Sequence, residues 1–136
     1  MIETPAAAHA PDLTLIETLA RQAIAALPAP FAAAAAGVLL RVEDLAPDDI
    51  LHEMDIDDPF ELTGLYDGIP LTEKSVMDQP TRPDTIWLFR RAILDEWVAR
   101  GDVALGDLVG HVLVHELAHH FGWTDEQIAA IDRWWE

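Results

Sequence analysis

Apolar residues recur every three or four positions through residues 13–27, which places them on one face of an α-helix. Asp12 precedes this stretch and can cap the helix, because its carboxylate accepts hydrogen bonds from the first free backbone N–H groups. Pro28 ends the helix, since proline lacks the N–H group that the next turn needs. The alanine-rich residues 31–36 then predict a short second helix, which Gly37 terminates.

The middle of the chain carries three short strand patterns, at residues 38–42, 62–66 and 85–89. The third is the clearest, because four of its five residues are β-branched or aromatic, the types that favour a pleated backbone. The acidic residues 47–59 predict a single helical turn around residues 49–54. Residues 70–84 contain three prolines and predict a long loop.

The final third of the chain returns to helical spacing. The pattern predicts helices at residues 92–100, 107–121 and 124–134, and glycines end the first two. Helices, then a few short strands, then helices predict an α+β fold with a small sheet of about three strands packed against helices. A length of 136 residues suits one domain. We therefore expect a flexible tail at residues 1–11 and a single domain at residues 12–136.

The chain has 25 acidic and 8 basic residues, which gives a net charge of −17. Such a surface repels phosphate groups and anionic lipids, so nucleic acid and membranes are disfavoured as partners. A basic peptide or protein is the partner class that this charge favours, although solubility alone also explains the charge. The N-terminus lacks a basic region followed by an apolar core, and no stretch reaches the roughly 18 apolar residues that span a bilayer. We therefore expect a cytoplasmic protein.

The segment His115-Glu116-Leu117-Ala118-His119 carries the strongest chemical signal in the chain, the pattern H-E-x-x-H. Two histidines four residues apart lie on one helical face, and both imidazoles can reach one zinc ion. Glu116 lies beside that face, where its carboxylate can act as a general base. Because the chain has no cysteine, any transition metal must be held by histidine, aspartate or glutamate side chains.

Catalytic zinc sites usually have three protein ligands and an open fourth position. Asp125 is our candidate for the third ligand, because Gly122 lets the chain reverse after the motif and bring this carboxylate back. An alternative is that Asp125 only begins the last helix, since residues 124–127 have the form of a capping box. The rival third ligands are Asp132, Glu136 or another histidine.

Three other polar residues are weaker candidates for a role at the metal site. His120 points about 100° away from His119 around the helix, which favours packing or support of a ligand. His111 shares the face of His115 one turn earlier, and we expect partial burial or a supporting role. Tyr66 is a candidate donor to a developing oxyanion, although a tyrosine within a strand more often belongs to the core.

Three segments of the chain resemble the minimal zincins, a family of small bacterial zincin-like metallopeptidases once known only as a domain of unknown function. The most specific segment runs from His115 to Asp125 and has the pattern H-E-x-x-H-x-x-G-x-x-D. Residues 62–72 and 84–91 are similar to the family's turn before the sheet and to its strand leading into helices. The resemblance spans roughly residues 27–133.

This resemblance implies a zincin-like α+β core with the motif on a helix in the C-terminal half. It also implies that His115, His119 and Asp125 hold a zinc ion and that Glu116 is the base. The pattern overlaps that of the metzincins, but no methionine follows Met77, so the Met-turn of that group is missing.

The sequence thus predicts a zinc-dependent metallopeptidase-like protein, in which an activated water hydrolyses a peptide bond and Glu116 moves the proton. A strand at residues 85–89 that lies at a sheet edge can pair with an extended substrate. The alternative is a non-catalytic module, in which zinc is closed off by four protein ligands and the acidic surface binds a basic partner. A third interpretation, a metal-free acidic helical protein, requires the motif to be accidental.

Overall fold

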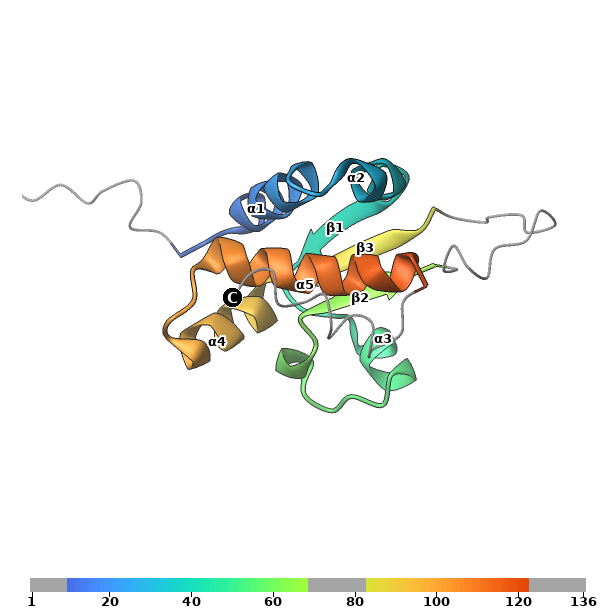
Figure 1. The fold of residues 1–136 in the computed structure, drawn as a ribbon. Coiled ribbons are helices and arrows are strands. Elements are labelled where there is room, and N and C mark those ends of the chain that lie inside the picture. Colours follow the sequence, from blue (N-terminus) through green and yellow to red (C-terminus); the bar gives the residue numbers. More distant parts are fainter. Residues whose placement is uncertain (1–9, 69–82, 123–136) are drawn as a thin grey trace, which may run out of the picture.

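The computed structural model describes residues 10–68 and 83–122 (Figure 1). The expected tail, apart from its last two residues, lies outside these ranges, as do most of the loop at residues 70–84 and the helix at residues 124–134. Asp125 and the two rival carboxylates lie outside them as well.

The order of helices and strands confirms the α+β class. Among the described residues the helices are α1 (Leu13–Ala25), α2 (Ala29–Ala35), α3 (Asp48–Glu53), α4 (Arg90–Arg100) and α5 (Leu105–His120), together with the 3-10 helix η2 (Pro59–Glu61). The strands are β1 (Leu39–Glu43), β2 (Gly64–Asp67) and β3 (Thr85–Phe89). The strand expected at residues 85–89 is confirmed residue for residue, whereas α4 begins two residues earlier and β2 two residues later than the pattern indicated.

The three strands form one sheet in the order β1-β3-β2, with β1 parallel and β2 antiparallel to β3. The expectation that residues 85–89 lie at a sheet edge is therefore wrong, because β3 is the central strand. Four of its five residues are buried, as is typical of a strand that is covered on both faces. Among the described strands, the two edges of the sheet are β1 and β2.

Helices α1 and α5 cover one face of the sheet (Figure 1). Ile16 and Ala20 of α1 are fully buried, together with Val109 and Leu113 of α5 and Leu88 of β3. Burying a large aliphatic side chain contributes about 1.5–3 kcal/mol. The helix that carries the histidine motif is therefore held in place by the main core of the protein.

A second, smaller core lies on the other side of β3. Phe89 and Ala92 are fully buried there and pack with Leu51 of α3, Leu62 and Ala46. This cluster joins the acidic segment around α3 to the start of α4. The helical turn expected near residues 49–54 is confirmed, and its one buried residue, Leu51, is the side chain that holds it to the sheet.

The two C-terminal helices end where the glycines indicated. Gly101 follows α4 with a φ of 77°, and Gly122 follows α5 with a φ of 81°. Glycine takes these left-handed values without the clash that a Cβ atom would cause. None of the described helices is long and apolar enough to cross a membrane.

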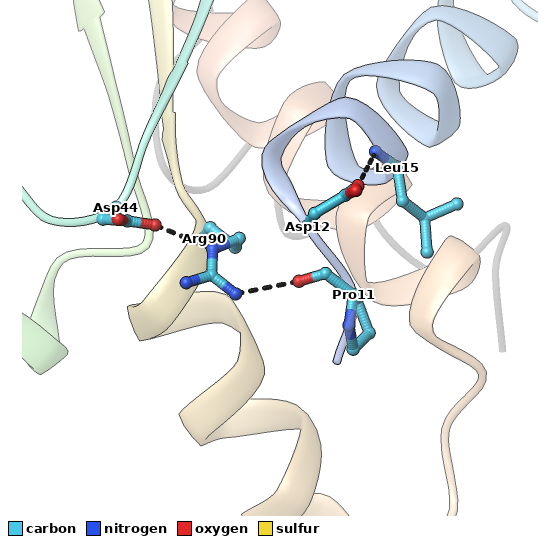
Figure 2. A network of polar contacts seen from close by, with 5 residues as sticks. All are labelled: Pro11, Asp12, Leu15, Asp44 and Arg90. Atoms are coloured by element: carbon cyan, nitrogen blue, oxygen red, sulfur yellow. Dashed lines mark hydrogen bonds and ion pairs between the residues drawn. The ribbon is translucent and has the colours of Figure 1, made fainter. Parts of the chain in front are cut away.

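Arg90, at the start of α4, joins three segments of the chain (Figure 2). Its Nε donates to Asp44 Oδ1 at 2.7 Å, and its Nη1 donates to the Pro11 carbonyl oxygen at 2.9 Å. Asp12 caps α1 as expected, with its Oδ1 accepting from the Leu15 N–H group at 2.8 Å. We call these contacts of Arg90 the Arg90 network; it ties the start of α1 and the turn after β1 to α4.

Candidate metal centre

Helix α5 presents the two histidines of the motif side by side. The rings of His115 and His119 have centroids 5.1 Å apart and planes at 80° to each other. Two imidazoles that share one zinc ion, with Zn–N bonds of about 2.0–2.1 Å and tetrahedral angles, have ring centroids about 5 Å apart. Both residues are half-buried. The spacing and chemistry of this donor pair therefore fit a zinc ion.

The described residues, 10–68 and 83–122, bring no third donor beside the histidine pair. Within these ranges, no group of three or more histidine, aspartate or glutamate side chains is arranged to hold a metal ion. His111 is half-buried on α5, and His52 is exposed on α3. Asp125 stays a prediction for this role.

Glu116 lies between the two histidines in sequence and faces the sheet. Burial raises the pKa of its carboxyl group from 4.5 to about 7, because removal from water penalises the charged form. A hydrogen bond from the Tyr66 backbone acts in the opposite direction, since it stabilises the carboxylate. A carboxyl group with a pKa near neutrality can take up a proton and release it again, as general acid–base catalysis requires.

Gly64 explains how the strand β2 comes so close to Glu116. A Cβ atom at this position would lie 2.8 Å from Val112 Cγ1, 3.2 Å from Glu116 Cγ and 3.2 Å from the Trp87 carbonyl oxygen. Real Cβ atoms essentially never come within 3.0 Å of such a neighbour, so only glycine allows this approach. The sequence pattern placed Gly64 only within a strand, although a glycine inside a strand often marks a close approach of another segment.

The backbone groups of β2 alternate in direction. The Phe89 N–H group donates to the Thr63 carbonyl oxygen at 2.9 Å, and the register pairs Leu65 with Trp87. In an antiparallel pair, hydrogen-bonded and non-hydrogen-bonded positions alternate. The N–H and C=O groups of Tyr66 therefore face the outer edge of β2, away from β3, and this is the side on which its backbone meets Glu116.

Three further polar side chains meet at the end of α5, and we call them the Tyr66 cluster: Tyr66, Asp84 and His120. Tyr66 Oη lies 3.0 Å from His120 Nδ1, and Asp84 Oδ2 lies 3.3 Å from the same nitrogen. His120 is only 4% exposed. Burial raises the pKa of Tyr66, and so do the charge of Asp84, its hydrogen bond and the charge of Asp67. The packing or supporting role predicted for His120 agrees with this position, whereas no local pattern assigned a role to the Asp84 side chain.

Residues 35–135 match the model of one protein family, described as zincin-like metallopeptidase. The chain belongs to the zincin-like metallopeptidase family. The match includes the whole sheet and α5 with its motif, and it supports a metallopeptidase-type function. Zincins typically bind zinc, the metal that the histidine pair fits. A search of curated protein sequences returns no match.

Proposed function

We propose that this zincin-like protein is a zinc-dependent peptidase, in which His115, His119 and Asp125 hold the metal ion and Glu116 is the general base. The observation that supports this most directly is the Glu116 carboxyl group, whose pKa burial raises to about 7, beside two imidazoles at zinc-like spacing. A purely structural zinc site is closed by four protein ligands and needs no proton acceptor. A zinc ion bound here supplies Lewis acidity towards water and towards the scissile carbonyl group.

Glu116 carries the proton in this proposal. Its carboxylate accepts a proton from the attacking water and later passes it to the leaving amine. In the metal-free protein burial raises the pKa of this group to about 7, which makes its carboxylate a stronger proton acceptor than an exposed glutamate. The hydrogen bond from the Tyr66 backbone keeps the carboxylate oriented between these steps.

Strand β2 is our candidate for the edge that pairs with an extended peptide substrate. It is an edge strand among the described strands, and its Gly64 lies directly against Glu116. A peptide aligned there would form main-chain hydrogen bonds with the outward-facing groups of Gly64 and with the Tyr66 carbonyl oxygen, while the Tyr66 N–H group stays on Glu116. The net charge of −17 favours basic peptides over acidic ones.

Zinc content, measured by elemental analysis on untagged protein, tests the metal site. We expect about one zinc ion per chain in the wild type, loss of zinc in His119→Ala and weaker binding in Asp125→Ala. His52→Ala is the matched control, because it removes an exposed histidine from α3 and leaves α5 intact. No zinc in the wild type, after incubation with zinc and removal of the excess, would exclude every zinc-dependent function.

Hydrolysis of a peptide library by the same proteins tests the chemistry. Glu116→Gln keeps the size of the side chain but removes the proton acceptor, so we expect unchanged zinc content and a rate lower by about 10²–10⁴-fold. Undiminished hydrolysis in this variant assigns the base to another residue. Bound zinc without hydrolysis of any peptide favours the alternative, a zinc-stabilised acidic interaction module.

A further inference from the structure

The Tyr66 cluster joins three separate elements near the proposed metal centre. Tyr66 belongs to β2, Asp84 directly precedes β3, and His120 is the last residue of α5. The side chains of His120 and Asp84 are 6% and 13% exposed. Burying polar groups is costly unless they are hydrogen-bonded, and the proposed zinc chemistry uses none of these three side chains.

One arrangement of protons satisfies all three members of the cluster. The Tyr66 hydroxyl group donates to Asp84, whose carboxylate can only accept hydrogen bonds. The hydroxyl oxygen then accepts from His120 Nδ1, 3.0 Å away, in the tautomer that carries its proton on Nδ1. The same Nδ1 lies 3.3 Å from Asp84 Oδ2. Asp84 is therefore the common acceptor for both neighbours.

Gly68, the residue directly after β2, lies against the Tyr66 cluster. A Cβ atom at this position would lie 2.8 Å from Tyr66 Oη and 2.7 Å from Asp84 Cγ, closer than real Cβ atoms come to such neighbours. Any larger residue must displace the side chain of Asp84 or of Tyr66. A Cβ atom at position 68 therefore disturbs the cluster without removing any of its polar groups.

Tyr66 makes contact with the proposed catalytic machinery through its backbone. Its backbone group hydrogen-bonds the Glu116 carboxylate, and two residues earlier Gly64 lies against Glu116 Cγ. The side chain of Tyr66 is meanwhile held by the last turn of α5. A shift of β2 along α5 would therefore disturb the hydroxyl contacts and the backbone contact together.

We propose that the Tyr66 cluster is a positioning device, which fastens the end of β2 to the last turn of α5 and so holds the Tyr66 N–H group at the carboxylate of Glu116. Tyr66, Asp84 and His120 are thus positioning residues that act through Glu116. The catalytic consequence rests on the proposed function, whereas the geometric part does not.

Amide hydrogen exchange, followed by NMR on the full-length metal-free protein, tests the geometric part. The N–H group at position 66 faces the outer edge of β2 and reports the bond to Glu116, while that of Leu65 faces β3 and reports the sheet. The ratio of the two exchange rates separates loss of the Glu116 bond from loosening of the sheet. We expect Tyr66→Phe to raise this ratio about tenfold, the effect of losing one modest hydrogen bond.

Matched variants control for loss of a hydroxyl group and for crowding. Thr18→Val removes a hydroxyl group from α1, outside the cluster, where Thr18 Oγ1 donates to the Thr14 carbonyl oxygen at 2.9 Å, and should leave the ratio unchanged. Gly68→Ala crowds the cluster without removing a donor and should raise the ratio. Gly37→Ala is its control, because a Cβ atom there meets nothing within 4 Å. An unchanged ratio in both Tyr66→Phe and Gly68→Ala would overturn the proposal.

Kinetics on a hydrolysed peptide test the catalytic part. We expect Tyr66→Phe to lower kcat about tenfold while zinc content and KM stay the same, because the substitution displaces the base and spares the metal ligands. If Tyr66→Phe loses zinc, or raises KM and leaves kcat unchanged, Tyr66 does not act through Glu116. If the wild type neither binds zinc nor hydrolyses any peptide, the proposed function fails. The exchange ratio then still decides whether the cluster positions Glu116.

Discussion

Two polar clusters hold distant segments of this chain together, and burial is what separates them. In the Arg90 network, the Asp44 side chain is 56% exposed and the ion pair measures 2.7 Å (Figure 2). In the Tyr66 cluster, the Asp84 side chain is 13% exposed and the contact to His120 measures 3.3 Å. Water competes for the first pair and screens its charges, whereas loss of one member of the second leaves polar groups buried. We therefore expect the contact between Asp84 and His120 to contribute more to stability than the shorter contact between Asp44 and Arg90.

Removal of the acidic residue from each cluster gives the largest expected difference. Asp84→Ala leaves the Tyr66 hydroxyl and His120 Nδ1 without their common acceptor, and we expect it to lower the free energy of unfolding by about 3 kcal/mol. Asp44→Ala should lower it by less than about 1 kcal/mol, since that carboxylate is mostly in water. Urea denaturation followed by circular dichroism measures both. An equal decrease in the free energy of unfolding for the two variants would show that burial does not make the Tyr66 cluster more stabilising than the Arg90 network.

Crowding by one methyl group gives the next largest effect. We expect Gly68→Ala to lower the free energy of unfolding by about 1 kcal/mol, because Gly68 is exposed but its Cβ atom would force the ends of the Tyr66 and Asp84 side chains to move. Gly37→Ala should change stability little, since the space around that position is open. Thermal unfolding of both variants beside the wild type measures the difference. A Gly68→Ala protein as stable as the wild type would mean that the side chains of the cluster can move aside at little cost.

The ionisation of Tyr66 provides a spectroscopic test, because it is the only tyrosine in the chain. Its pKa is raised above the ordinary value of 10.0, first by burial and then by Asp84, so the folded protein should show no tyrosinate absorbance at pH 10. The unfolded chain releases this proton near pH 10. The folded state therefore binds more protons above that pH, and its stability falls as the pH rises further. Asp84→Asn should lower the pKa of Tyr66, while Asp44→Asn should not.

The smallest expected effect is the coupling within the Arg90 network. A double-mutant cycle on Arg90 and Asp44 should give about 0.2–1 kcal/mol at low salt. The coupling should decrease further in concentrated salt, because the charges of a surface pair are screened. A coupling that is large and independent of salt would show that the network behaves like a buried cluster.

Local patterns in the sequence predicted much of the fold. The cap at Asp12, the bounds of β3 and the glycines after α4 and α5 each depend on the conformation of a few neighbouring residues. The pairing of His115 with His119 is of the same kind, since a helix alone places residues four apart on one face. The third ligand, Asp125, depends on how the chain returns after Gly122 and stays a prediction.

Patterns along the chain were enough to predict the α+β class, the helix that carries the motif and the family to which the chain belongs. The folded arrangement was needed to find that β3 is the central strand, that Gly64 lies against Glu116, and that Tyr66 meets His120, 54 residues away along the chain. Periodicity and capping act over a few residues, whereas contacts between distant segments arise when several faces are buried at once. The residues that position Glu116 are of this second kind, and no local pattern marks them.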